Sequence, residues 1–300
     1  MAGTPTGRRQ DQFEEPSPAS GRRAGYDGEL PRLTLSASCP LTVRNMTARP
    51  WSRDETLAAF SLYCRTPFGR LHSRNADIIE LAAALGRTPG SVAMKCCNLA
   101  AFDPVQQSRG IQGLGKGSHL DGEIWDAFQQ DPESIGFESE VITASFLGRA
   151  PEASKAVRWE DAEGLDREAL TKVRVNQALF RSIILAGYRN ACCVCKTPVR
   201  ELLVAAHIVP WSIDRALRMN ACNGLCLCAL HDRAYDRGLL GVYPDLTIHA
   251  SRTVNQHADD YTVSTMLTAF EGRRIELPDR WQPDPLLLER HQELVGFLAA

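Results

Sequence analysis

The chain has 300 residues, of which 44% are apolar and 23% are charged, and its formal net charge is −2. This composition is that of an ordinary globular protein, and the length is sufficient for two modest domains. No run of 18 apolar residues occurs, and Arg8-Arg9 near the N-terminus precedes no apolar stretch. These features exclude a membrane-spanning helix and argue against a secretory signal, so a cytoplasmic protein without a membrane partner is expected.

Charge is distributed unevenly along the chain. Residues 46–120 carry a net +4 and residues 171–240 a net +6, whereas residues 121–170 carry −9 and residues 241–300 carry −4. Basic segments attract polyanions because binding releases counterions, so nucleic acid is the favoured partner of the two basic segments. The alternative is that surface charge varies between segments without a function.

Residues 1–45 are rich in Gly, Pro, Ser and Arg and lack apolar periodicity, which is typical of a disordered leader. Met46 stands directly before the first organised stretch and is a second candidate start of translation.

Residues 46–120 are expected to form a helical, DNA-binding-like domain. Ser52 and Glu55 make a capping box at the start of the first helix. A second helix is expected from about Asn75 to Gly86, and Thr88-Pro89 opens a third.

These three short helices resemble a Myb/SANT-like or other helix-turn-helix module, whose last helix enters the major groove. Arg87 and Lys95, with Ser91 and Asn98, are therefore expected to face outward and to contact DNA. The alternative is a plain three-helix bundle that binds protein or nothing. Residues 121–170 are expected to be an acidic linker with one helix near Glu123–Phe128.

The domain from residue 171 to residue 300 begins with an amphipathic helix. Arg174, Gln177 and Arg181 share one face of it, and two guanidinium groups and an amide suit phosphate oxygens of DNA. A solvated helix face without a ligand is the alternative.

Six of the ten cysteines lie between Cys192 and Cys228, which indicates reduced thiols and a candidate metal site. Cys192 and Cys195 form a C-x2-C pair, and a structural zinc ion would need two further ligands. Cys222, Cys226 and Cys228 follow about 30 residues later, and the candidate set is Cys192, Cys195, Cys226 and Cys228. Buried, reduced cysteines without a metal are the alternative.

The stretch from Leu202 to Gly238 has the pattern strand, long loop, strand, helix. A strand over Leu202–Ala206 delivers His207, an Asn223-Gly224 turn precedes a return strand over Leu225–Cys228, and His231 opens a helix.

The segments AHIVPWS, NGLCLCALHD and DRGL resemble the motif of the HNH endonucleases, whose fold is the ββα-metal unit, in the bacterial branch of restriction endonucleases. The likeness extends over roughly residues 50–295, with a specific core at 172–242. It implies an α+β protein in which the N-terminal three-helix module precedes an HNH nuclease domain. Residues 243–300 would buttress that domain.

The resemblance also implies roles for single residues. His207 matches the general base that activates water, Asn223 matches the residue that fixes the loop, and His231 matches a metal ligand. A divalent cation, Mg²⁺ or Mn²⁺, would stabilise charge on the scissile phosphate. Many relatives place Asp or His before the base, but this chain has Ala206, so His231, Asn223 and Asp232 are the candidate ligands.

The function expected from this resemblance is metal-dependent, restriction-type hydrolysis of double-stranded DNA. A homodimer would explain cutting of both strands by a one-site nuclease. The alternative is a non-catalytic DNA-binding regulator in which the HNH unit is a zinc-stabilised scaffold.

Overall fold

The computed structural model describes residues 49–111, 118–154 and 166–297. The expected leader lies outside these ranges. Helices and two small antiparallel sheets make up the described part, so the α+β class is confirmed. None of the helices in these ranges combines the length and apolar character that a membrane crossing requires.

Three helices begin the described chain: α1 (Arg53–Arg65), α2 (Ala76–Leu85) and α3 (Pro89–Ala100), with a short 3-10 turn η1 (Phe68–Arg70) between the first two. Their ends are those that the sequence predicts. Ser52 and Glu55 form the capping box of α1, Gly86 ends α2 in the left-handed conformation, and Thr88 caps α3 with Pro89 at its first position. Local capping residues thus determine where these helices begin and end.

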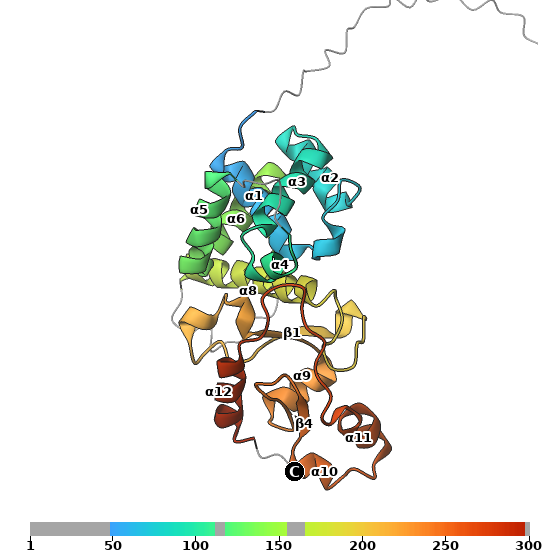
Figure 1. The fold of residues 1–300 in the computed structure, drawn as a ribbon. Coiled ribbons are helices and arrows are strands. Elements are labelled where there is room, and N and C mark those ends of the chain that lie inside the picture. Colours follow the sequence, from blue (N-terminus) through green and yellow to red (C-terminus); the bar gives the residue numbers. More distant parts are fainter. Residues whose placement is uncertain (1–48, 112–117, 155–165, 298–300) are drawn as a thin grey trace, which may run out of the picture. The chain divides into compact units, whose positions relative to one another are not determined.

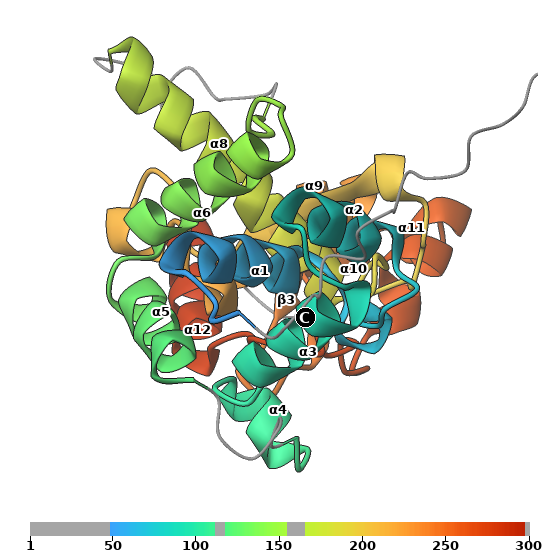
Figure 2. The same ribbon diagram turned by 90° about the horizontal axis from the view of Figure 1, so that it is seen from above.

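The first three helices do not stand alone as a module. The short α4 (Pro104–Ser108) leads toward α5 (His119–Gln130) and α6 (Pro132–Phe146), and both longer helices pack against α1 (Figure 2). Phe60 of α1 packs edge-to-face against Trp125 and Phe128 of α5. The spacer expected over residues 121–170 is therefore wrong for residues 121–146, because its apolar residues complete the core around α1.

Acidic side chains of α5 and α6 pair with basic side chains of α1 and α3. These ion pairs are Arg53–Glu138, Arg65–Glu140 and Lys95–Asp121. The negative charge of the expected linker thus offsets part of the positive charge of the preceding segment within the fold. Excess basic charge in residues 46–120 is consequently weaker support for DNA binding than the sequence alone indicates.

Helix α8 (Arg167–Gly187) lies between the helical half and the strands, where it contacts α1 and α6 on one side and β1 and β2 on the other (Figure 1). Strand β1 (Leu203–His207) follows the turn η2 (Arg200–Leu202) and pairs antiparallel with β2 (Gly224–Cys228). The register places His207 opposite Gly224. The loop between the strands contains η3 (Arg215–Leu217) and η4 (Ala221–Asn223), and α9 (Ala229–Asp236) follows β2.

Gly224 is not the turn residue that the Asn-Gly pair predicts. Its φ of −132° and ψ of 139° are those of extended backbone, and the turn η4 ends before it. The backbone conformation therefore does not require glycine at this position. The side chains of Phe180 and Ile184 do, because they lie where a Cβ of residue 224 would be.

A second hairpin pairs β3 (Leu240–Val242) with β4 (Ile248–Ala250). It is followed by α10 (Arg252–Asn255), α11 (Tyr261–Met266), η5 (Thr268–Phe270) and α12 (Pro285–Val295). Helix α11 ends at Met266, directly before Leu267 and the turn η5, and α12 has Pro285 at its first position.

The segment before α12 binds the helical half as well as the strands. Arg280 is 1% exposed, and its guanidinium donates hydrogen bonds to the carbonyl oxygens of Tyr63, Cys64 and Thr66 at the end of α1. These carbonyls have no partner within the helix, so a cation there satisfies them. Trp281 stacks on Trp125. The C-terminal residues therefore support the helical half in addition to the expected nuclease domain.

Candidate metal centre and active site

Four side chains of the HNH-like segment converge on one point. Cys192 and Cys195 lie in the turn after α8, Cys228 caps the N-terminus of α9, and His231 lies in the first turn of that helix. One ligand atom from each lies within 4.8 Å of the other three. Within the described ranges, this is the one group of three or more Cys, His, Asp and Glu side chains with that geometry.

The distances inside this Cys3His cluster are close to those of a metal site. His231 Nδ1 lies 3.1 Å from Cys228 Sγ and 3.6 Å from Cys192 Sγ, and the Sγ atoms of Cys195 and Cys228 are 3.9 Å apart. Tetrahedral zinc with sulfur and nitrogen ligands holds those atoms about 3.5–3.8 Å apart. Cys192, Cys228 and His231 are buried, so the cluster fits a closed structural zinc site.

The thiols of the cluster have unequal acidity. A hydrogen bond from Cys192 holds the pKa of the Cys228 thiol far below its ordinary value, and the contact with His231 acts in the same direction. The same hydrogen bond raises the pKa of Cys192, which burial also raises. Zinc binds thiolates, so the cluster already favours one ligand in its binding form before a metal enters.

Cys226 is not part of the cluster, contrary to the ligand set predicted from the sequence. It precedes Cys228 by two residues on β2, which places it about 7 Å away along the strand. His231 takes the fourth position because the first turn of α9 brings it back toward Cys228. The signal for this set was present in the sequence: Cys228-x2-His231 has the same spacing as Cys192-x2-Cys195.

The position of His231 favours a place in the thiol cluster over its expected role at the catalytic cation. Nδ1 faces the thiols, and Nε2 lies 2.7 Å from the carbonyl oxygen of Met266. Since a carbonyl only accepts, Nε2 carries the proton and Nδ1 offers its lone pair to the cluster. A zinc-bound imidazole is commonly oriented in this way by a hydrogen bond at its other nitrogen. Since both ring nitrogens already have partners, His231 does not fit as a ligand of the catalytic cation as well.

His207 lies at the end of β1, apart from this cluster. Its Nε2 is 3.0 Å from the carbonyl oxygen of Arg218, so Nε2 donates and the neutral ring carries its lone pair on Nδ1. The ring stacks on Phe180 and meets the edge of Trp211. The half-buried imidazole thus has a defined orientation and a nitrogen suited to accept a proton.

Asn223 is fully buried, and its side chain holds the loop between β1 and β2. Its Oδ1 accepts from the backbone N–H of Val209, and its Nδ2 donates to the carbonyl oxygens of Val209 and Leu217. This is the loop-fixing geometry that the HNH resemblance implies. Because the amide is buried and bonded to backbone, it does not fit the additional role of a metal ligand.

Asp232 is the third residue that the sequence predicts as a ligand of the catalytic cation. It follows His231 on α9 and is half-buried. Successive helix residues point about 100° apart, so Asp232 projects away from the direction of the thiols. Magnesium is often bound by one or two carboxylates together with water and substrate phosphates, so a single aspartate fits such a site.

The three predicted phosphate contacts of α8 have different surroundings. Arg174 is exposed. Gln177 is half-buried, and its Oε1 is a buried atom without a hydrogen-bond partner in the described structure. Arg181 donates to the carbonyl oxygens of Leu203 and Arg200, so it holds the chain entering β1. Of the three, Arg174 has the surroundings that a phosphate contact requires.

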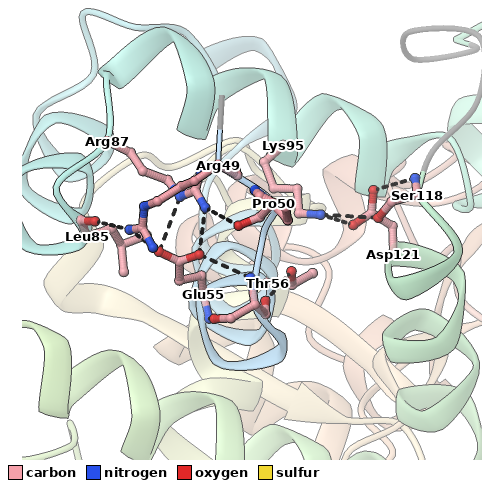
Figure 3. A network of polar contacts seen from close by, with 10 residues as sticks. Arg49, Pro50, Glu55, Thr56, Leu85, Arg87, Lys95, Ser118 and Asp121 are labelled. Atoms are coloured by element: carbon pink, nitrogen blue, oxygen red, sulfur yellow. Dashed lines mark hydrogen bonds and ion pairs between the residues drawn. The ribbon is translucent and has the colours of Figure 1, made fainter. Parts of the chain in front are cut away.

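Arg87 and Lys95 are turned into the protein, so their predicted outward orientation is wrong (Figure 3). Arg87 binds the buried carboxylate of Glu55, which Arg49 also contacts, and its guanidinium lies over Trp51. The Lys95 side chain is 3% exposed and pairs with the fully buried Asp121 of α5. Their orientation could not be predicted because their carboxylate partners, Glu55 and Asp121, lie 26 or more residues away in the sequence.

Comparison with known proteins agrees with the arrangement of β1, β2 and α9. Residues 192–243 match the model of the family described as HNH endonuclease, and this range contains the whole Cys3His cluster, both strands and α9. No curated protein matches the chain. Residues 192–243 therefore form a segment of the HNH endonuclease type, in which β1, β2 and α9 have the ββα order.

Proposed function

We propose that this protein is a metal-dependent, restriction-type endonuclease that hydrolyses phosphodiester bonds of double-stranded DNA, with His207 as the general base. The observation that carries the proposal is the orientation of the His207 imidazole. Its Nε2 donates to the Arg218 carbonyl, so the lone pair of the neutral ring is on Nδ1, the nitrogen that we assign to take a proton from an attacking water. An imidazole pKa near neutrality suits this exchange.

The roles of the other motif residues follow from their contacts. Asn223 keeps the loop after β1 in place through three backbone hydrogen bonds, and this loop contains the Arg218 carbonyl that orients His207. The Cys3His cluster would hold zinc and fix the start of α9 against β2. That helix start also positions Asp232, the residue that we assign to the catalytic cation.

A bound Mg²⁺ or Mn²⁺ would supply positive charge to the scissile phosphate and the leaving 3′ oxygen. The chain itself would contribute the base, the carboxylate of Asp232 and, through Arg174, a phosphate contact that does not depend on base sequence. Hydrolysis would leave a 5′-phosphate and a 3′-hydroxyl.

Plasmid nicking in Mg²⁺ or Mn²⁺ tests the proposal. The wild type and His207→Ala are compared with His257→Ala, which removes an exposed histidine outside the site. We expect metal-dependent nicking by the wild type and by His257→Ala, and a loss of at least about 100-fold in His207→Ala. Equal nicking by all three proteins would contradict the assignment of the base.

The second candidate function, a DNA-binding regulator with a zinc-stabilised scaffold, is favoured by the Cys3His cluster, which needs no catalytic cation. DNA binding by the wild type without nicking in either metal, and unchanged binding by His207→Ala, would favour this regulator over the nuclease.

A further inference from the structure

The His207 ring is supported by residues outside the HNH motif. Phe180 of α8 is 2% exposed and lies flat on the imidazole, with ring centroids 3.9 Å apart and an interplanar angle of 9°. Trp211 meets the same ring edge-on, with centroids 5.4 Å apart. One face and one edge of the imidazole are thus bounded by aromatic carbon.

Arg218 connects this aromatic support to the hydrogen bond that orients the ring. Its carbonyl oxygen accepts from His207 Nε2, its Nε donates to the carbonyl oxygen of Trp211, and its guanidinium lies 4.9 Å from the Trp211 ring. The Arg218 carbonyl that accepts from His207 is therefore linked to the Trp211 ring through the Arg218 side chain. Phe180 is a separate contact of the His207 ring, and it comes from a different element, helix α8, which packs against β1 and β2.

Gly224 explains how Phe180 reaches this position. It is paired with His207 across the two strands. A Cβ at Gly224 would lie 3.0 Å from Phe180 Cζ and 2.8 Å from Ile184 Cγ1, both closer than side chains normally approach. Since the Gly224 backbone is extended, the missing side chain, and not a special φ, is what the site requires.

We infer that Phe180 is a positioning residue for the general base, and that Gly224 is glycine because Phe180 and Ile184 occupy the space of its side chain. This inference rests on the proposed function in assigning a base role to His207. The hydrogen bond from Nε2 to the Arg218 carbonyl disfavours a flip of the ring, because a flip would break that bond. The flat contact with Phe180 restricts tilting of the ring about its last torsion and so keeps Nδ1 in one direction.

The test replaces Phe180 by Leu, which keeps apolar bulk but removes the flat ring. Leu179→Ala is the matched control, because Leu179 is also buried on α8 but packs against Gly136 of α6. Both variants lose packing. With saturating DNA, we expect kcat of Phe180→Leu to fall about 10- to 100-fold with little change in KM, whereas Leu179→Ala retains the wild-type kcat.

A second readout does not depend on cleavage. Imidazole ¹⁵N–¹H correlation spectra at a pH where His207 is neutral report which nitrogen carries the proton, and His207→Ala identifies the signals. We expect one Nε2–H form in the wild type and in Leu179→Ala, and a mixture of forms or exchange broadening in Phe180→Leu. If the wild type does not cleave DNA, the proposed function fails, but these spectra still decide the positioning role.

Phe180→Met, with a thinner and more flexible side chain, is the second variant if Phe180→Leu does not fold. The inference is overturned if a folded Phe180 variant retains both the His207 spectrum and the wild-type kcat. It is supported if the spectrum changes in that variant and not in Leu179→Ala.

Discussion

The two halves of this protein use buried polar groups in different ways. In the HNH segment, buried His231 contacts two thiols and buried Asn223 holds the loop after β1, and both residues belong to a motif that the sequence displays. In the helical half, buried Lys95 and Glu55 pair with opposite charges of another helix and of turns, and no motif marks these pairs. A motif therefore points to a function in the first case, whereas in the second the buried charges stabilise the fold.

The contrast also changes the meaning of charge segregation along the chain. The basic side chains of α1 and α3 and the acidic side chains of α5 and α6 lie in separate segments of the sequence, but they pair in the fold. A basic segment is evidence for a polyanion partner only when its charges remain on the surface. Arg174 on α8 meets that condition, and Arg87 and Lys95 do not.

The largest effect is expected when the buried pair between α3 and α5 is broken. Asp121→Ala leaves the ammonium group of Lys95 buried without its partner, which should cost about 3–5 kcal/mol of folding stability. Urea unfolding measures this loss. The double variant Lys95→Met/Asp121→Leu should recover most of the stability, since it removes both charges together.

The same double variant also tests whether Lys95 only stabilises the fold or also contacts DNA. We expect its affinity for duplex DNA, and the salt dependence of that affinity, to equal those of the wild type. A weaker affinity with a smaller salt slope would mean that Lys95 contacts DNA after all.

A smaller effect is expected at His291, a buried histidine on α12. His291 is 3% exposed and stacks on Tyr235, and burial lowers its pKa to about 4, although Asp236 opposes this shift. An unfolded chain binds a proton at this residue below about pH 6.5, where the folded protein does not. The stabilisation is therefore complete above about pH 6.5 and is lost as the pH falls toward 4.

Between pH 7 and pH 5 the loss attributable to His291 should be about 2 kcal/mol. Urea unfolding at both pH values is compared for the wild type and His291→Phe, so that other acid-sensitive groups contribute equally. The variant should lose less stability on acidification. An identical loss in the two proteins would show that His291 is not held neutral.

The smallest effect is expected at the exposed arginine of α8. Arg174→Ala should weaken DNA binding similarly for every sequence and reduce the slope of log affinity against log salt by about 1. Arg181→Ala is the matched comparison on the same helix, because Arg181 holds two carbonyl oxygens before β1. It should lower stability more than it changes the salt slope. A reduced salt slope in Arg181→Ala together with a loss of stability in Arg174→Ala would contradict this assignment.

Local features of the fold were predictable from the sequence because they depend on neighbouring residues. Ser52, Gly86 and Thr88 mark helix ends through their own capping bonds, and the strands around His207 follow from short apolar runs. The packing of α5 and α6 on α1 was not predicted, since it depends on apolar faces that meet only in the folded chain. The many acidic residues of this segment favoured the interpretation as a linker, although α5 and α6 each have a buried face.

The two histidines and the asparagine of the candidate site could be predicted from the motif, whereas the ligand set of the metal could not. His207, Asn223 and His231 all lie at the expected places in the ββα unit. The assignment of His231 to the thiols could have come from its C-x2-H spacing with Cys228, but the HNH motif favoured a catalytic metal. Phe180 carries no sequence signal, because an apolar residue on an amphipathic helix predicts only burial.

The central claim is that the two histidines of the motif have separate tasks, with His207 as the base and His231 as a zinc ligand. The zinc content of the purified protein, measured by elemental analysis after dialysis against a weak chelator, tests it most directly. We expect one zinc ion per chain in the wild type, in His207→Ala and in Cys226→Ser, and a loss of zinc in His231→Ala. Full zinc retention by His231→Ala, or zinc loss in Cys226→Ser alone, would contradict the assignment.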